Sequence, residues 1–276
     1  MIKDIVVSLS PNDETATAID YSLSLAAAFE AHIAGVAFIY EPAIPGSVFD
    51  GAAPAMIESM RAEAEQIGRA TRKRFDEAVR RAGVSAESHL LDSSAGRSAL
   101  VFGQVARHFD LSVVVQPRPD GIFPDDMVFE DALFHSGRPV LMVPYARRAP
   151  AQFDRIMVCW DGSRAATRAI ADSMPILQRG QRIEIVTVSA SEGPKDELPG
   201  FDIAHHLARH GITVQLKNLV AGDADTTDAI LSYGADTSTD LIVMGGYGHS
   251  RLRQFILGGV TRGMLSSMTI PTLMSH

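Results

Sequence analysis

Two groups of residues in the second half of the chain have types and spacing that could hold a nucleotide or an anion. The first is Asp161-Gly162-Ser163, which follows the apolar segment 155–160. A carboxylate at the end of a strand can accept hydrogen bonds from ribose hydroxyls or hold a cation. The alternative is that Asp161 or Ser163 only caps the helix that follows.

The second group is the glycine-rich stretch 245–261, which opens with Gly245-Gly246-Tyr247-Gly248-His249 and closes with Gly258-Gly259-Val260-Thr261. Glycine lets backbone N–H groups approach an anion, and a helix N-terminus adds partial positive charge. Two adjacent glycines inside a helix cost about 1–2 kcal/mol relative to alanines. We therefore expect a break at Gly258-Gly259 and a new helix from Val260. The alternative is two tight turns that bind no ligand.

The common phosphate-binding patterns are absent from this stretch. No lysine of the chain is followed by Ser or Thr, so the P-loop pattern fails. The dinucleotide pattern GxGxxG fits Gly246 and Gly248 but has Arg251 at its third glycine. His249 could contact a phosphate or a partner chain, but no oriented nucleophile accompanies it. No catalytic set can be assembled from the spacing, so any hydrolysis would be slow.

Two other kinds of candidate are better explained as structural. His206 and His210 are spaced i, i+4 and could share a metal with His205 nearby, but no HExxH pattern is completed, so we expect a solvated face. Cys159 lies in an apolar strand and is expected to be an inert core thiol. As the chain's one cysteine, it also excludes a disulfide framework.

Composition limits the class of protein. The chain has 276 residues, 46% of them hydrophobic, and a formal net charge of −8. This apolar content excludes a disordered chain, and the acidity argues against nucleic-acid or anionic-membrane binding. No run of about 18 apolar residues is present, and the first residues do not resemble a secretory signal. We expect a soluble cytoplasmic protein.

The elements that would position these residues occur twice. Three stretches recur in the same order: 4–10 matches 155–161, 109–116 matches 239–246, and 137–144 matches 268–275. Each half therefore begins with a strand, has a second apolar strand later and ends with a strand beside a proline. This predicts a tandem duplication, with domains at 1–148 and 149–276.

Within each half, short apolar strands alternate with helices. In the second half we expect strands at 155–160, 183–189, 212–220, 241–245 and 269–275, and helices at 163–178, 201–210, 225–233 and 251–267. The first half adds a loop at 41–54 and a longer helix at 55–82. This alternation predicts an α/β fold, in which each domain is a doubly wound parallel sheet with helices on both faces.

The first half lacks the candidate ligand residues. Ser10 stands where the second half has Asp161, and Arg118 stands roughly where it has Gly248. The segment 116–126 contains three prolines, which lack backbone donors, and three aspartates, which would repel a triphosphate. We expect no nucleotide in the first half.

These motifs resemble the universal stress protein family. Gly245, Gly248 and Gly258 fit the glycine spacing of its nucleotide-binding branch, whereas Gly259 stands where that branch has Ser or Thr. Both halves resemble the family, as in a member with two tandem domains, and the resemblance is stronger in the second half. It implies a five-stranded parallel sheet in the order 3-2-1-4-5 in each half.

The resemblance also implies roles for individual residues of the second half. Asp161 would hold the ribose, Val188 would offer backbone hydrogen bonds to adenine, Cys159 and Trp160 would line the base pocket, Met244 and Gly245 would border the ribose, and the backbone of Gly248, Gly258, Gly259 and Val260, with Thr261 nearby, would hold phosphates. These residues would form one adenine-nucleotide site.

The leading hypothesis is a stress-response protein that binds ATP or a related adenine nucleotide in its second half, with Mg²⁺ accompanying a triphosphate. The alternative is a nucleotide-free scaffold or interaction module of the same fold. A weaker third hypothesis is an adenylate-forming or ATP-pyrophosphatase-type enzyme. The last strand of each half is an edge, so we also expect the halves to pair with each other through these strands, and a homodimer remains open.

Overall fold

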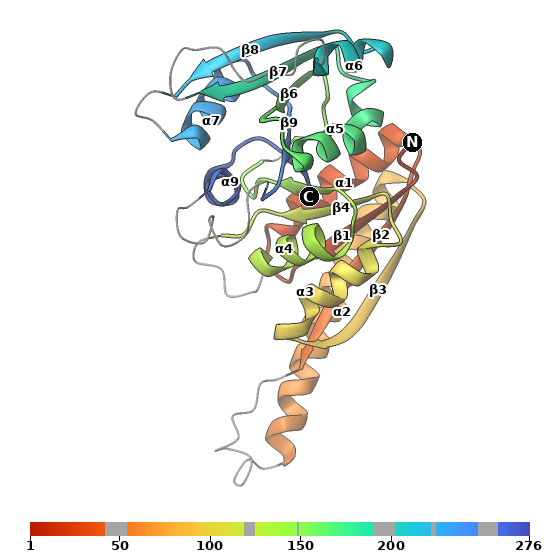
Figure 1. Cartoon of the computed structure of the whole chain (residues 1–276). Helices are drawn as coiled ribbons and strands as arrows, with labels where there is room; N and C mark the ends of the chain where they lie inside the picture. The colour runs from red at the N-terminus through yellow and green to blue at the C-terminus, as the bar shows by residue number, and fades with distance from the viewer. Residues whose placement is uncertain (42–53, 119–124, 148, 190–201, 222–224, 248–258) are drawn as a thin grey trace. The chain divides into compact units, whose positions relative to one another are not determined.

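The chain forms two compact units, Met1–Pro150 and Ala151–His276, which we call unit 1 and unit 2 (Figure 1). The computed structural model describes residues 1–41, 54–118, 125–147, 149–189, 202–221, 225–247 and 259–276. The sequence places the boundary after residue 148, and the structure places it after Pro150.

Unit 1 is a five-stranded parallel sheet whose strands alternate with helices. Its elements are β1 (Asp4–Leu9), α1 (Thr15–Phe29), β2 (His32–Glu41), α2 (Pro54–Ala82), β3 (Ala86–Ser94), α3 (Ala95–Ala106), β4 (Leu111–Val115), α4 (Asp125–His135) and β5 (Val140–Val143). The strands lie in the order β3-β2-β1-β4-β5, and every pairing is parallel.

Unit 2 repeats this arrangement. Its described elements are β6 (Arg155–Cys159), α5 (Arg164–Leu177), β7 (Arg182–Ser189), α6 (Ile203–Arg209), β8 (Val214–Val220), α7 (Thr226–Asp236), β9 (Leu241–Gly245), α9 (Val260–Ser267) and β10 (Thr272–Ser275). The order is β8-β7-β6-β9-β10, again with parallel pairs. The predicted α/β class is confirmed.

Helices cover both faces of each sheet. All five residues of β4 are buried, as are Leu241–Met244 of β9, and consecutive strand residues point to opposite faces. In unit 1, α1 packs against α2 and α3 packs against α4. In unit 2, α5 packs on β6, β9 and β10, whereas α7 packs on β7 and α9. Each unit therefore has its own apolar core.

The duplication is visible in hydrogen bonding as well as in topology. An aspartate precedes the fourth strand of each unit, at Asp110 and Asp240. Asp110 Oδ2 accepts from the Lys3 amide at 2.8 Å, and Asp240 Oδ2 accepts from the Arg155 amide at 2.9 Å. Both carboxylates thus fix the first strand beside the fourth. This repeated bond gives a structural reason for the aspartate that precedes the fourth strand in both halves.

The end of α7 and the start of β10 differ from the predicted boundaries, as does the start of β8 at Val214 rather than residue 212, whereas the start of α9 agrees. The helix expected to end at Tyr233 continues to Asp236, because Gly234 serves close packing rather than termination: a Cβ there would lie 2.7 Å from Ile270 Cδ1. The last strand begins at Thr272 rather than at residue 269. The predicted helix start at Val260 is confirmed. None of the helices in the described part of the chain is long and apolar enough to cross a membrane.

Candidate functional site

The candidate site lies at the carboxyl ends of β6 and β9, the two central strands of unit 2. These strands pair directly, with Val158 beside Val243. The chain leaves β6 toward β7 through α5, and it leaves β9 toward β10 through α9. The connections therefore diverge above this pair of strands, which is where open α/β sheets bind ligands.

Asp161 and Ser163 form the turn between β6 and α5. Asp161 is exposed, and its Oδ1 accepts from the Ser163 amide at 2.9 Å. Ser163 is the N-cap of α5, since its Oγ accepts from the Ala166 amide at 3.1 Å. The helix-capping alternative is thus confirmed for Ser163. Asp161 keeps an exposed carboxylate at the end of β6, beside Trp160, which is half-buried.

Cys159 is the last residue of β6 and directly precedes Trp160 and Asp161. Burial raises the pKa of the Cys159 thiol to about 12, and the Asp161 carboxylate adds to the rise. A thiol with this pKa is protonated at neutral pH, whereas the thiolate is the nucleophile. Cys159 is half-buried rather than a core residue, and its thiol is in the protonated form, which is not the nucleophile.

Val188 presents backbone groups beyond the end of β6. The Val186 carbonyl accepts from the Trp160 amide at 2.8 Å, so Val186 faces β6. The Ser189 carbonyl accepts from the Ala221 amide at 3.0 Å, so Ser189 faces β8. Because strand residues alternate in direction, Val188 faces the same side as Val186. β6 has ended there, which leaves the Val188 N–H and C=O directed over the Trp160-Asp161 turn.

Met244 and Gly245 end β9 on the other side of the site. Met244 is buried. A Cβ on Gly245 would lie 2.5 Å from the Ala166 amide nitrogen and 2.8 Å from Ala165 Cβ. Gly245 therefore lets the start of α5 approach β9. This structural role was missed by the sequence analysis, which assigned Gly245 only to the ligand.

Tyr247 and Thr261 connect the end of β9 to α9. The Tyr247 amide donates to Thr261 Oγ1 at 3.0 Å, and Thr261 is buried. Gly259 is the N-cap of α9 and carries no side chain that could cap the helix, and the Arg262 amide donates to the Gly259 carbonyl at 2.9 Å. Val260 opens the helix and is half-buried. Thr261 thus helps to hold this helix in place.

Three predicted site residues, Gly248, His249 and Gly258, lie outside the described residues. Both the amide and the carbonyl of Gly246 also bond to the end of the chain at Ser275 and His276, which the sequence does not predict. Its amide donates to the Ser275 carbonyl at 2.8 Å, and its carbonyl lies 3.0 Å from His276 Nδ1. Nothing in the residue types signals this contact, because it depends on the β9–β10 register.

The histidine candidate forms no metal centre among the residues that the structure describes. His206 and His210 are exposed, and their ring centroids lie 4.9 Å apart in an edge-on arrangement. No group of three or more His, Cys, Asp or Glu side chains within the described ranges could hold a metal ion. The exposure of both side chains agrees with the solvated face that the sequence predicts.

In unit 1, side chains interact across the corresponding place. Arg118, which follows β4, pairs with Glu14, which follows β1, at 2.7 Å. The guanidinium also lies 5.6 Å from the ring centroid of Tyr145, which follows β5. In unit 2, Asp161 accepts from the Ser163 amide, and the Tyr247 amide donates to Thr261. The ends of the central strands are bridged by an ion pair in unit 1.

Comparison with known proteins matches the second half of the chain to one family. Residues 152–276 match the model of the universal stress protein family. The universal stress protein Slr1230 of Synechocystis is 30% identical over 131 residues, which cover 45% of this chain and 44% of that protein. The matched part thus spans less than half the length of this curated relative.

Solved structures extend the similarity of fold to both units. A universal stress protein from Archaeoglobus fulgidus aligns with a TM-score of 0.68 at 17% identity and covers 98% of this chain and 94% of its own. A putative universal stress protein from Pseudomonas aeruginosa aligns with a TM-score of 0.58 at 14% identity, covering 99% and 92%. These alignments show the fold, and the family match in unit 2 adds the sequence relationship. Unit 2 thus matches the universal stress protein family in sequence, and both units have the fold of the solved universal stress protein structures.

Proposed function

We propose that unit 2 binds ATP or a related adenine nucleotide at the carboxyl ends of β6 and β9, and that the protein acts in a stress response with the nucleotide as ligand or regulator. The observation that carries the proposal is the direction of the Val188 backbone. Its N–H and C=O face the space beyond β6, above Trp160 and Asp161. This is one donor beside one acceptor at the end of β6, where the half-buried Trp160 and the exposed Asp161 follow.

This donor–acceptor pair favours adenine over guanine. Adenine offers the N1 acceptor and the N6 amino donor, which complement the Val188 N–H and C=O. Guanine has the opposite polarity at the corresponding atoms, N1–H and O6, and would leave buried polar groups unpaired. A mismatch of this kind weakens binding strongly because each unpaired group keeps its desolvation cost.

The sugar and phosphates would lie toward β9. Asp161 is the exposed carboxylate at the end of β6 and can accept hydrogen bonds from ribose hydroxyls. The start of α9 at Gly259-Val260 can direct backbone amides and a partial positive charge at a phosphate. Gly248 and Gly258 contribute through their sequence spacing alone. Mg²⁺ would accompany a triphosphate, and Asp161 is a carboxylate of the type that fits it.

A nucleotide held here would turn over slowly at most. The Cys159 thiol is protonated, and Ser163 is engaged in capping α5. Neither residue is paired with a general base in the described hydrogen bonds. The proposed role is therefore binding, with the bound nucleotide changing the order of the loops or the assembly of the protein.

The test compares ATP, adenosine and GTP by isothermal titration calorimetry on the full chain. We expect ATP to bind at least about tenfold more tightly than GTP. Asp161→Asn keeps a side-chain oxygen for the Ser163 amide but removes the charge, and it should weaken ATP binding roughly tenfold. Asp172→Asn is the matched control, because Asp172 is a carboxylate on α5 that pairs with Arg168. It should leave ATP binding unchanged.

The second candidate function is a nucleotide-free interaction module. It is favoured by one observation: two polar groups predicted for the ligand already have partners in the fold, Asp161 with the Ser163 amide and Thr261 with the Tyr247 amide. Two results together would overturn the nucleotide proposal: no heat of binding at millimolar ATP, and no nucleotide in mass spectrometry of the purified protein. The interaction module would then be the better-supported function.

A further inference from the structure

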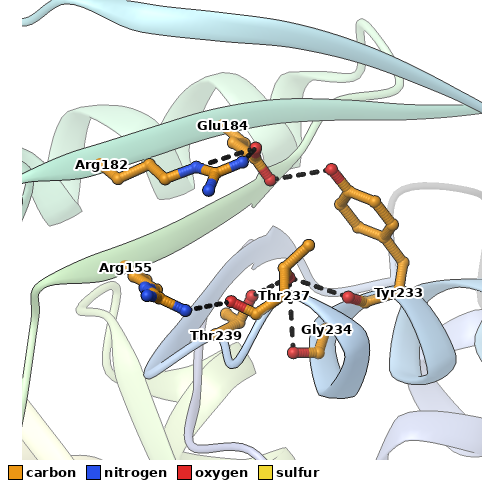
Figure 2. Close-up of polar contacts among 7 residues, drawn as sticks. All are labelled: Arg155, Arg182, Glu184, Tyr233, Gly234, Thr237 and Thr239. Carbon is orange, nitrogen blue, oxygen red and sulfur yellow. Dashed lines mark hydrogen bonds and ion pairs between the residues drawn. The ribbon is translucent and has the colours of Figure 1, made fainter.

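Helix α7 connects the two parts of the proposed site. It packs against β7, the strand that ends near Val188, and against α9, the helix that starts at Gly259-Val260. On the β7 side, the Tyr233 hydroxyl donates to Glu184 Oε2 at 3.0 Å (Figure 2). This bond joins the last part of α7 to the first part of the strand, away from the strand's carboxyl end.

The Glu184 carboxylate is a fixed point for this bond. Glu184 is 6% exposed, and its other oxygen, Oε1, accepts from Arg182 Nη2 at 2.6 Å. Lys217 Nζ lies 5.8 Å from the centroid of the Tyr233 ring. Burial raises the pKa of the Tyr233 phenol, and its hydrogen bond to Glu184 raises it further. The phenol is therefore a protonated donor at neutral pH.

Helix α7 also lies in close contact with α9. A Cβ on Gly263 would lie 2.5 Å from Thr227 Oγ1, and Thr227 is 4% exposed. The Thr227 amide is held by Asp225 Oδ1 at 2.7 Å at the start of α7. Because no side chain separates Gly263 from Thr227, a displacement of α7 must displace α9 with it.

We propose that Tyr233 and Glu184 are positioning residues for the phosphate end of the nucleotide site. Their hydrogen bond fixes α7 on β7, the Thr227–Gly263 contact fixes α9 on α7, and the Gly259-Val260 amides are thereby directed at the ligand. The inference rests on the proposed function of unit 2. The base end is independent of it, because Val188 is held by β7 itself.

The test uses ATP and adenosine as two probes on Tyr233→Phe. Removing the hydroxyl should weaken ATP binding roughly three- to tenfold, while adenosine binding stays unchanged. Glu184→Gln leaves one oxygen for two donors, the Tyr233 hydroxyl and Arg182, so it should also weaken ATP binding while adenosine binding stays unchanged. A purely structural role would change ATP and adenosine binding together.

A second measurement needs no ligand. Hydrogen exchange of the amides in 260–267 should be faster in Tyr233→Phe than in the original chain. Ser173→Ala is the control, since it removes a buried hydroxyl bonded to Ile170 on α5 and should leave that exchange unchanged. Equal loss of ATP and adenosine, or unchanged exchange in 260–267, would overturn the inference. If the original chain binds neither probe, the proposed function is wrong, and the exchange experiment still decides whether the bond positions α9.

Discussion

At the scale of single residues, one buried polar side chain in the sheet of unit 1 lacks the hydrogen bond that burial normally requires. Ser112 of β4 is fully buried, and its hydroxyl has no hydrogen-bond partner among the described residues. The corresponding residue of the second repeat is Ile242, which is also fully buried. An unpaired buried hydroxyl keeps its full desolvation cost. Ser112 is therefore a polar residue at a place where the fold requires an apolar one.

We predict that Ser112→Ala raises the free energy of unfolding by about 1 kcal/mol, because it removes this unpaired group. Urea denaturation followed by circular dichroism measures the change. Thr272→Val is the control: Thr272 is equally buried, but its hydroxyl donates to the Ile270 carbonyl at 3.0 Å, so stability should fall. A loss of stability in Ser112→Ala would show that the hydroxyl has a partner after all.

The sequence predicts which residues could bind a ligand better than it predicts the packing roles that the same residues have in the fold. The carboxylate at the end of β6 and the helix start at Val260 could be predicted, because both follow from the strand–turn–helix pattern. The packing of Gly245 against Ala166 could not, because it depends on the crossing of α5 over β9. The direction of Val188 came from the family resemblance, and its physical reason appears only in the strand register.

At the scale of elements, the end of helix α1 has a backbone conformation that disfavours a side chain. Helix α1 ends at Glu30, which has φ 51° and ψ 45° in the left-handed region. Its amide donates back to the Ala26 and Ala27 carbonyls, which is the arrangement that glycine usually provides after a helix. A residue with a Cβ is disfavoured in this conformation.

We predict that Glu30→Gly raises the midpoint of thermal unfolding, with a gain of about 0.5–1 kcal/mol in the free energy of unfolding. Glu30→Ala removes the same exposed carboxylate but keeps the Cβ, so it separates the backbone effect from the charge. Differential scanning calorimetry on both variants measures the midpoint of thermal unfolding. A midpoint for Glu30→Gly no higher than that of Glu30→Ala would contradict the prediction.

Element types were predictable from period and composition, whereas element ends were less so. The long helix of unit 1 was expected at 55–82 and runs over Pro54–Ala82, because its polar and apolar residues alternate at helical spacing. Gly234 looked like a helix end, but it lies inside α7 against Ile270. Sequence shows that a glycine is present, but a close approach to a distant side chain is visible only in the fold.

At the scale of the whole molecule, the two units share a topology but differ at the ends of their central strands. In unit 1, the Arg118–Glu14 ion pair joins the segments that follow β4 and β1, and Tyr145 lies beside the guanidinium. In unit 2, the corresponding segments carry Asp161 on one side and Gly245 with Tyr247 on the other. A duplicated fold thus has one place filled by its own side chains and one that presents ligand-type groups.

We therefore predict one nucleotide per chain, bound by unit 2. Titration calorimetry of the full chain with ATP should give a stoichiometry of one, and photolabelling with 8-azido-ATP should modify peptides from 151–276. In Asp161→Asn, the heat of binding and the label should weaken together, because unit 1 has no second site to retain either signal.

A stoichiometry of two, or a labelled peptide from 1–150, would contradict the prediction. That result would mean that the Arg118–Glu14 pair opens in solution, since an ion pair with a half-exposed guanidinium contributes only about 0–1 kcal/mol. Arg118→Ala would then increase labelling of unit 1, whereas it changes nothing if the Gln116–Arg118 backbone, with Pro117, already excludes the nucleotide.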